Sequence, residues 1–145
     1  MKIVKVRNVK TPTRGTGLSA GLDFYIPEDF EIKQIWPGES INIPSGIKAR
    51  IPQGCALIMF NKSGIATKHQ LQVGACVVDE DYQGEIHLHV MNAGKKTVLL
   101  KPGMKLVQGL VMPIFHTEVE VLESEAELFP QSTERGQGGF GSTGE

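Results

Sequence analysis

Three acidic residues stand where an apolar stretch runs into a turn. The sequence VVDEDYQGEI places Asp79, Glu80 and Asp81 directly after Val77 and Val78. A carboxylate at the end of a strand can be aimed by the strand, and a free aspartate, with a pKa near ~3.9, is ionised at neutral pH but is a weak base. Two interpretations are therefore open. Either Asp79 is a positioned carboxylate or all three acids are solvated turn residues, and for Glu80 we prefer the second interpretation.

The C-terminal stretch PQSTERGQGGFGSTGE also holds groups that can contact a ligand. Five of the nine residues from Gly136 to Gly144 are glycine, and such a stretch cannot bury enough apolar surface to order itself. Its glycine-rich part nevertheless carries Arg135, Phe140 and the hydroxyls of Ser142 and Thr143, which suit a flexible arm that closes on a ligand. A P-loop is not expected, because only Glu145 follows Gly144 and no helix can form there. A disordered end and a ligand-closing arm both remain open.

Histidines and cysteines give no strong signal for metal or redox chemistry. His87 and His89 lie two residues apart on one strand face, a spacing that can bind a transition metal. No third ligand is evident, and half-exposed strand histidines are commoner. Cys55 and Cys76 lie in apolar stretches without CxxC spacing, which indicates buried thiols in a reducing compartment, with a disulfide as the alternative.

Short β-rich runs alternate with turns along most of the chain. Gly and Pro number 17 and 8 and fall at intervals. In Glu85–Val90 the residues Ile86, Leu88 and Val90 share one face, as in a half-buried strand. Many short strands predict an all-β sandwich, barrel or jelly roll, and residues 123–129 are a weak helical candidate. The expected strands are KIVKV (2–6), SINIP (40–44), CALIMF (55–60), EIHLHVM (85–91), TVLL (97–100), KLVQGLVMPIF (105–115) and TEVEVL (117–122).

The totals describe an ordinary protein of one domain. The 145 residues, 40% hydrophobic and 21% charged, suffice for a hydrophobic core. A formal net charge of -1 argues against duplex DNA or an anionic membrane as partner, whereas one nucleotide asks only for local donors and a cation. The start MKIVKVRNVK lacks the apolar region of a signal peptide, and CALIMF is too short to cross a bilayer. We expect a cytoplasmic protein with no nucleic-acid and no membrane partner.

Five segments stand out along the chain: AGLDFY (20–25), NKSGIA (61–66), GACVVDEDYQGEI (74–86), GMKLVQGLV (103–111) and RGQGGFGSTG (135–144). Together they resemble, in order, the five motifs of the trimeric dUTPase (deoxyuridine 5′-triphosphate nucleotidohydrolase) family. Each motif alone is weak. All five in order, with family-like spacing from Thr11 to Thr143, are highly specific.

This resemblance implies an architecture and an activity. The expected fold is a jelly-roll-like β-barrel or sandwich over residues 1–129, followed by a flexible Gly-rich arm over residues 130–145 that closes over the active site. The expected assembly is a homotrimer with shared active sites. The expected reaction is Mg²⁺-dependent hydrolysis of dUTP to dUMP and pyrophosphate by water attack on the α-phosphate. This reaction limits uracil incorporation into DNA and supplies dUMP for dTMP synthesis.

The third motif would supply catalysis and base recognition. By similarity, Asp79 orients and deprotonates the attacking water, an assistance worth roughly 10²–10⁴ in rate. Tyr82 resembles the tyrosine that lies beneath deoxyribose and leaves no room for a 2′-hydroxyl, with packing across a hairpin as the alternative. Backbone groups near Cys76 and His87 would pair with uracil and reject cytosine, because unmatched buried polar groups are costly. Many family members have glycine at both positions, so Cys76 and His87 are departures.

The second and fourth motifs would bind the phosphate chain. Ser63 and the amide of Gly64 resemble the donors near the scissile bridge. Lys62 and Lys105 stand where the family commonly has arginine; lysine keeps the charge but loses the planar two-pronged geometry. Gln108 resembles the family glutamine at the phosphate side of the site. The alternative interpretation is that Gln108 is simply a polar residue in a strand.

The first motif and the arm would complete the site. By similarity, Asp23 holds water molecules on Mg²⁺, an ion that keeps several waters and favours one or two carboxylates plus phosphates. In the arm, Arg135 would reach the γ-phosphate and Phe140 would stack over uracil, which is worth roughly 1–3 kcal/mol. The phosphates would be capped by Gly141, Ser142 and Thr143.

Three other functions are open. A relative with the same fold deaminates dCTP, although the complete DEDYQGE hairpin and FGSTG arm favour the hydrolase. A nucleotide-binding sensor without catalysis is the second, and intact Asp79, Asp23, Ser63 and Arg135 weigh against it. A purely structural β-sandwich is the third, and it leaves the ordered motifs unexplained.

Overall fold

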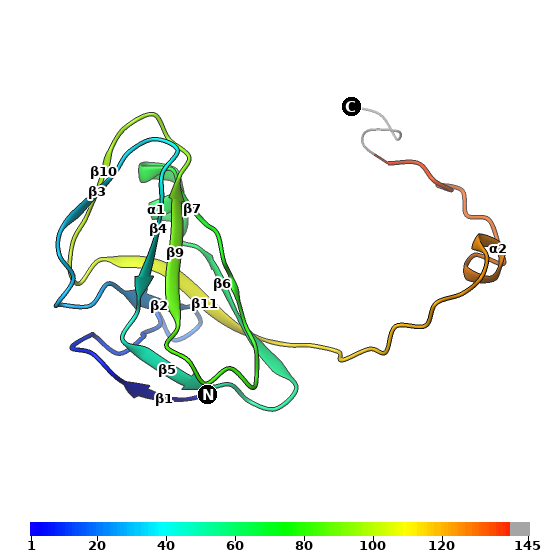
Figure 1. The fold of residues 1–145 in the computed structure, drawn as a ribbon, viewed down its shortest axis with the longest axis horizontal. Coiled ribbons are helices and arrows are strands. Elements are labelled where there is room, and N and C mark those ends of the chain that lie inside the picture. The colour runs from blue at the N-terminus through cyan, green and yellow to red at the C-terminus, as the bar shows by residue number, and fades with distance from the viewer. Residues whose placement is uncertain (140–145) are drawn as a thin grey trace. The chain divides into compact units, whose positions relative to one another are not determined.

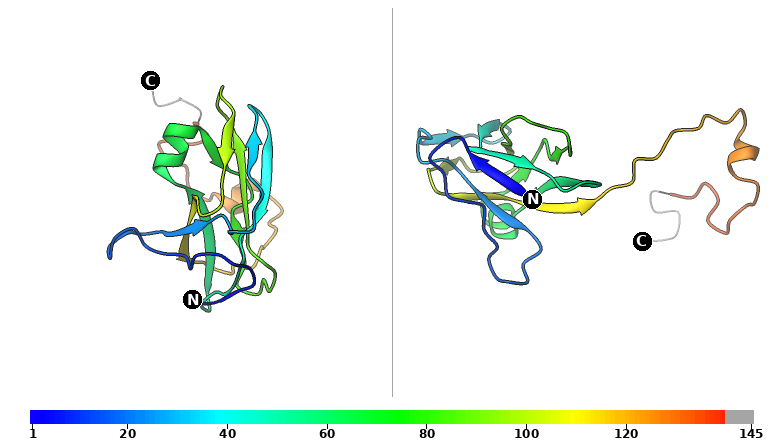
Figure 2. Two further views of the ribbon diagram at one scale, coloured as in Figure 1. Left: turned by 90° about the vertical axis from the view of Figure 1, so that its left-hand side faces the viewer. Right: turned by 90° about the horizontal axis from the view of Figure 1, so that it is seen from below.

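The computed structural model describes residues 1–139, and the chain divides into two compact units, Met1–Phe115 and His116–Glu145. The first unit is built from short antiparallel strands (Figures 1 and 2). The strands are β1 (Lys2–Lys5), β2 (Leu22–Tyr25), β3 (Lys33–Ile35), β4 (Ser40–Pro44), β5 (Ile47–Arg50), β6 (Cys55–Asn61), β7 (Leu71–Val73), β8 (Val77–Val78), β9 (His87–Asn92), β10 (Val98–Leu100) and β11 (Lys105–Pro113).

These strands form sheets that face one another across the core. One sheet has the order β2-β11-β6-β8 and another the order β4-β9-β7, while β1 pairs with β5 and β3 with β10. The core draws on both larger sheets, with Phe24, Leu57 and Val107 from the first and Ile43 and Leu88 from the second. The predicted all-β class is therefore confirmed. Among the described residues the sheets form a sandwich and do not close into a barrel.

The alternation predicted in β9 is confirmed. Leu88 and Val90 are buried, whereas His87 is exposed and His89 half-buried. Strand β9 pairs with β4 on one side and β7 on the other, so its apolar face lies over the core and its histidine face points away from it. Both cysteines are free and half-buried.

The structure corrects the expected helices and one expected strand. Helix α1 (Ser63–His69) was missed, because no side chain caps it, none of its residues is buried and its stop is Gln70 in the left-handed region (φ 54°) rather than a glycine. Helix α2 (Glu125–Leu128) lies within the predicted 123–129 and begins at Ser124, whose Oγ accepts from the Glu127 amide.

The expected strand TEVEVL does not form. Its alternating valines, Val119 and Val121, are 89% and 87% exposed, and residues 117–122 have no strand partner in the described chain. A strand needs a neighbour for its backbone groups, and alternation alone does not supply one. The predicted division at residue 129 stays a prediction. Between residues 1 and 139, no helix is long and apolar enough to cross a membrane.

Candidate active site

A buried carboxylate lies at the centre of a cluster formed by β2, β11 and the end of β6. Asp23 is opposite Gln108 in the β2–β11 pairing, and Gln108 is opposite Phe60 of β6. Asp23 is 5% exposed. Its Oδ1 lies 2.6 Å from Lys62 Nζ and its Oδ2 lies 3.0 Å from Lys105 Nζ. The register of three strands thus brings residues of the first, second and fourth motifs together.

The two lysines keep Asp23 ionised. Burial alone would raise the pKa of Asp23, but the hydrogen bonds and charges of Lys62 and Lys105 outweigh it and lower the pKa below its ordinary value. In return, the hydrogen bond to Asp23 and the negative charge of Asp23 raise the pKa of Lys105. The cluster therefore holds one negative and two positive charges at neutral pH, a local cationic excess that suits a phosphate chain.

The amide of Gln108 is held in one orientation. Its Nε2 donates to the carbonyl of Asn61 over 2.9 Å, and its Oε1 lies over Gly21. A Cβ built on Gly21 would come within 2.5 Å of that oxygen, so only glycine allows this close approach. Asn61 is fixed in turn, since its Oδ1 accepts from the Val73 amide and its Nδ2 donates to Gln72.

Ser63 and Gly64 lie beside this cluster. Both are exposed, and they form the first two residues of α1, directly after Lys62. The first amides of a helix have no partner within the helix, so these amides and the Ser63 hydroxyl are donors next to the Lys62 charge.

A second group of predicted residues lines a small cavity, and most of the residues around this cavity lie between Ala75 and His87. The cavity has a volume of about 210 Å³, below the roughly 300–1,000 Å³ of sites for drug-sized ligands. This size suits a single nucleobase. One lining residue comes from β4 and one from β6, and the others belong to the third motif and the start of β9. The lining residues are Asn42, Met59, Ala75, Cys76, Val77, Val78, Asp79, Tyr82, Ile86 and His87.

The turn after β8 is anchored on both sides of Asp79. The Cys76 carbonyl accepts from the Met59 amide over 2.7 Å before the turn. After it, Glu80 Oε2 accepts from the Gly54 amide over 2.7 Å. Glu80 is therefore an anchor of this turn, and its interpretation as a solvated residue is wrong. Asp79 itself is exposed, so a rigid turn presents a free carboxylate at the cavity edge.

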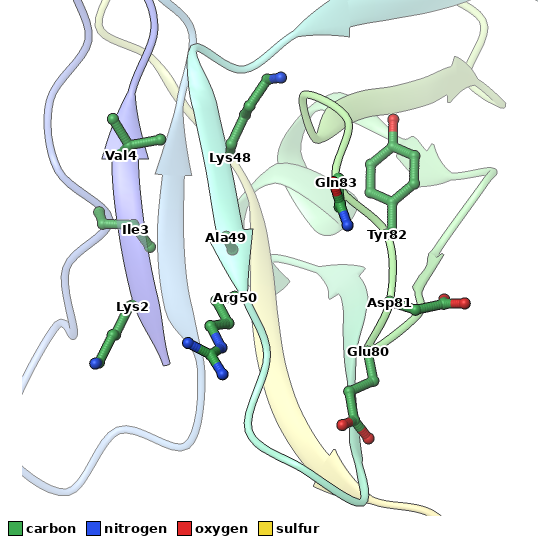
Figure 3. Close-up of a pocket in the computed structure, with 10 residues that line it drawn as sticks. All are labelled: Lys2, Ile3, Val4, Lys48, Ala49, Arg50, Glu80, Asp81, Tyr82 and Gln83. Atoms are coloured by element: carbon green, nitrogen blue, oxygen red, sulfur yellow. The ribbon is translucent and has the colours of Figure 1, made fainter.

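Tyr82 separates this cavity from a larger hollow. The hollow, of about 430 Å³, lies between the 80–83 loop and the β1–β5 ribbon (Figure 3). Among the predicted site residues that the structure describes, Tyr82 alone lines it. The Tyr82 ring is 43% exposed and its hydroxyl donates to the Glu85 carbonyl over 3.0 Å. The Tyr82 ring therefore forms the boundary between the small cavity and the larger hollow.

The histidines are engaged in local hydrogen bonds. His89 Nδ1 accepts from the Ala75 amide over 2.8 Å. His87 Nδ1 lies 2.9 Å from the Glu85 carbonyl, and it must carry a proton to bond there. From residue 1 to residue 139, no three His, Cys, Asp or Glu side chains gather into a group that could hold a metal.

The two groups of site residues lie at opposite edges of one sheet. Asp23 belongs to β2 and Asp79 follows β8, while β11 and β6 lie between these strands. Three strand spacings amount to about 14 Å. Within one chain, Asp79 and Asp23 thus lie at opposite edges of this sheet.

The predicted arm is described in part. Arg135 is exposed, and its Nε donates to the Gly138 carbonyl over 2.8 Å. The remaining predicted arm residues, Phe140, Gly141, Ser142 and Thr143, lie outside the described residues.

The motif order and the fold agree with the comparisons to known proteins. A family model described as dUTPase matches residues 7–144. The chain belongs to the dUTPase family. It is 38% identical over 133 residues to the human mitochondrial deoxyuridine 5′-triphosphate nucleotidohydrolase, covering 92% of this chain and 50% of that protein. The relative from Gloeothece citriformis is 39% identical over 127 residues, with 86% and 82% covered. The chain therefore spans half the length of the human relative.

Solved dUTPase structures share the fold. The dUTPase of Staphylococcus bacteriophage 80alpha with dUPNHPP matches with a TM-score of 0.82 at 22% identity, over 99% of this chain and 98% of that one. A mutant dUTPase of phage phi11 of S. aureus, described with a coordinated structural Mg(II) ion, matches with a TM-score of 0.76 at 20% identity, over 86% and 97%.

Sequence reasoning missed residues that hold the dUTPase motifs in place. Glu85, Arg7 and Asn61 were assigned no role, and Lys105 was considered only as a substitution for arginine. Asn61 and Glu85 lie inside the quoted motifs, so their position was a usable signal. Nothing local marks Arg7, because its partner Glu85 is 78 positions away.

Proposed function

We propose that this chain hydrolyses dUTP to dUMP and pyrophosphate, by attack of a water on the α-phosphorus. In the cell this reaction would limit uracil incorporation into DNA and supply dUMP for dTMP synthesis. The observation that carries the proposal is the 210 Å³ cavity, which has Tyr82 as a wall and the Asp79 carboxylate at its edge. Membership of the dUTPase family supports it.

Base selection would rest on the main chain near Cys76 and His87. The Cys76 carbonyl is fixed by the Met59 amide, and His87 lies in β9 opposite Pro44. A backbone group held as the Cys76 carbonyl is cannot adjust to cytosine, so a mismatched base would leave polar groups unpaired. The side chains of Cys76 and His87 line the cavity and take up space that glycine would leave open.

Phosphate binding would rest on the cluster around Asp23. Lys62 supplies a positive charge, Gln108 an amide donor, and Ser63 and Gly64 a hydroxyl and an amide at the start of α1. These donors can position the chain for in-line attack, and charge stabilisation with positioning is the main source of rate in phosphoryl transfer. Asp79 would then orient the water and accept its proton, and Arg135, Phe140, Gly141, Ser142 and Thr143 of the arm would cover the bound nucleotide.

The residues fit Mg²⁺ only as an ion carried by the phosphates. Both oxygens of Asp23 are bonded to lysines, yet each carboxylate oxygen retains a further lone pair that can hold a metal-bound water. Asp23 would thus hold the hydration shell and not the ion itself. When bound, Mg²⁺ neutralises phosphate charge and fixes the triphosphate conformation.

A homotrimer with shared sites is part of the proposal. Its support is that Asp79 and Asp23 lie at opposite edges of the four-stranded sheet, three strand spacings or about 14 Å apart across the sheet. In the proposed trimer, the hairpin of one subunit would face the phosphate cluster of a neighbour. We also propose a cytoplasmic location, with no nucleic-acid or membrane partner, from the composition and the net charge of -1.

The test is pyrophosphate release from a panel of deoxynucleoside and ribonucleoside triphosphates with Mg²⁺. We expect dUTP to be turned over much faster than dCTP, dTTP or UTP. Ammonia release from dCTP would identify a deaminase instead. Binding of dUTP without pyrophosphate release would identify a nucleotide sensor, and either result would overturn the proposal.

A further inference from the structure

Glu85 joins three segments of the chain beside the Tyr82 turn. Its Oε1 accepts from Arg7 Nε over 2.8 Å and from the Gly46 amide over 2.7 Å. Its side chain is 17% exposed. Burial alone would raise the pKa of Glu85, but the bonds from Arg7 and Gly46 outweigh it and lower the pKa. The carboxylate is therefore well satisfied where it lies.

Gly46 holds its side of this junction rigidly. It has a φ of +75°, and a Cβ there would come within 2.8 Å of Val9 and 3.0 Å of Arg7, so the position requires glycine. Its amide donates to Glu85, while its carbonyl accepts from the Val6 amide over 2.8 Å. The Glu85 carboxylate is thus tied to the β4–β5 turn and to the segment after β1.

The main chain of Glu85 holds Tyr82. The Glu85 carbonyl accepts the Tyr82 hydroxyl over 3.0 Å. The ring folds back over Gly84, where a Cβ would lie 2.2 Å from the hydroxyl oxygen. Packing against Gly84 covers only part of the ring, because Tyr82 is 43% exposed and borders the 430 Å³ hollow on its other side. Figure 3 shows Tyr82 at the edge of that hollow. Its hydrogen bond to the Glu85 carbonyl therefore helps to hold the ring out of the hollow.

We propose that Glu85 is a positioning residue for nucleotide selectivity: clamped by Arg7 and Gly46, it holds the carbonyl that keeps the Tyr82 ring as the wall against a 2′-hydroxyl. This inference rests on the proposed function. Glu85 contacts no substrate itself and acts through Tyr82. Without the clamp the ring gains access to the hollow, and room for a ribose appears.

The experiment compares dUTP with UTP for the wild type and for Glu85→Gln, Glu85→Ala and Arg7→Met. We expect the preference for dUTP, as a ratio of kcat/KM values, to fall at least about tenfold in Glu85→Ala and Arg7→Met, since small misplacements near a reacting centre have effects of this order. Glu85→Gln keeps the shape and the Gly46 bond, and should lose less. Most of the change should be a lower KM for UTP.

Two further variants separate positioning from general destabilisation. Asp29→Asn is the matched control: it removes the other carboxylate beside Arg7, at 3.6 Å and 54% exposed, and should leave the preference unchanged. Tyr82→Ala should lower the preference for dUTP over UTP at least as much as any of the other variants. The double variant Tyr82→Ala/Glu85→Ala should have the same preference as Tyr82→Ala alone. The Gly46 amide proton, followed by NMR without nucleotide, should shift upfield in Glu85→Ala.

The outcomes distinguish the two proposals. A wild type that prefers dUTP, with a folded Glu85→Ala or Arg7→Met that keeps the full preference, overturns the role of Glu85 and leaves the hydrolase in place. A wild type that releases no pyrophosphate from dUTP overturns the proposed function, and the inference with it. Equal loss of dUTP and UTP turnover in Glu85→Ala would mark a merely structural residue and also overturn the inference.

Discussion

At the scale of residues, the chemistry depends on two carboxylates in opposite surroundings. Asp79 is exposed at the end of an anchored turn, whereas Asp23 is buried between two lysines. The first is free to accept a proton from water. The second is held ionised by its neighbours and has no spare freedom to act as a base. These environments support the proposed catalytic role of Asp79 and the proposed electrostatic role of Asp23.

Asp79→Asn should abolish most turnover while leaving binding intact. The amide keeps the size of the side chain but cannot take the proton of the attacking water. We expect kcat to fall roughly 10²–10⁴-fold, with the Kd of a non-hydrolysable dUTP analogue changed little. Steady-state kinetics and calorimetric titration measure the two quantities, and a variant with near wild-type kcat would contradict the role of Asp79.

Asp23→Asn should change how stability depends on pH. Because the folded pKa of Asp23 is lowered, ionised Asp23 stabilises the fold above its unfolded pKa of ~3.9, and this contribution disappears as the pH falls through the lower folded value. The wild type should therefore exceed Asp23→Asn in free energy of unfolding at pH 7, and the gap should shrink toward pH 3. Urea unfolding at both pH values tests this, and a gap independent of pH would contradict it.

At the scale of elements, the register of β2, β11 and β6 brings the proposed phosphate-binding residues together. Gln108 lies opposite Asp23 and Phe60, and its amide is oriented by the Asn61 carbonyl on one side and by the space above Gly21 on the other. Gly21 of the first motif thus leaves the space that the Gln108 amide of the fourth motif occupies. This contact depends on the pairing of β2 with β11.

Gly21→Ala should weaken phosphate binding without unfolding the protein. The new methyl would meet Gln108 Oε1 at 2.5 Å and Gln108 Cβ at 3.1 Å, so the amide must turn away from its place. We expect kcat/KM for dUTP to fall about tenfold or more. Gly17→Ala is the matched control, because nothing lies within 4 Å of the added Cβ. Equal kinetics for both variants would show that Gln108 orientation is unimportant.

At the scale of the whole molecule, the proposed site is completed between subunits. The four-stranded sheet separates its two edges by about three strand spacings, or 14 Å, with Asp79 at one edge and Asp23 at the other. In the proposed trimer, one nucleotide would draw on residues from different copies of the chain.

Mixed trimers test this sharing directly. Asp79→Asn subunits and subunits lacking residues 130–145 should each be nearly inactive alone. When they are refolded together, some sites combine an intact Asp79 with an intact arm, so part of the activity should return. The pyrophosphate release of purified mixed trimers is the measurement. No recovery in assemblies verified to contain both subunit types would argue against shared sites.

The sequence by itself determined the β-rich class, several strands and the ordered motifs, because alternation and turn residues are local signals and the motifs are read directly. It did not reveal α1, which lacks caps and a buried face, and it predicted a strand at TEVEVL that has no partner in the described chain. Only the tertiary structure paired Asp23 with Lys62 and Lys105, tied Glu80 to Gly54 and joined Glu85 to Arg7. These contacts link residues far apart in the chain, and their partners are fixed by strand register and turn geometry, which no local pattern encodes.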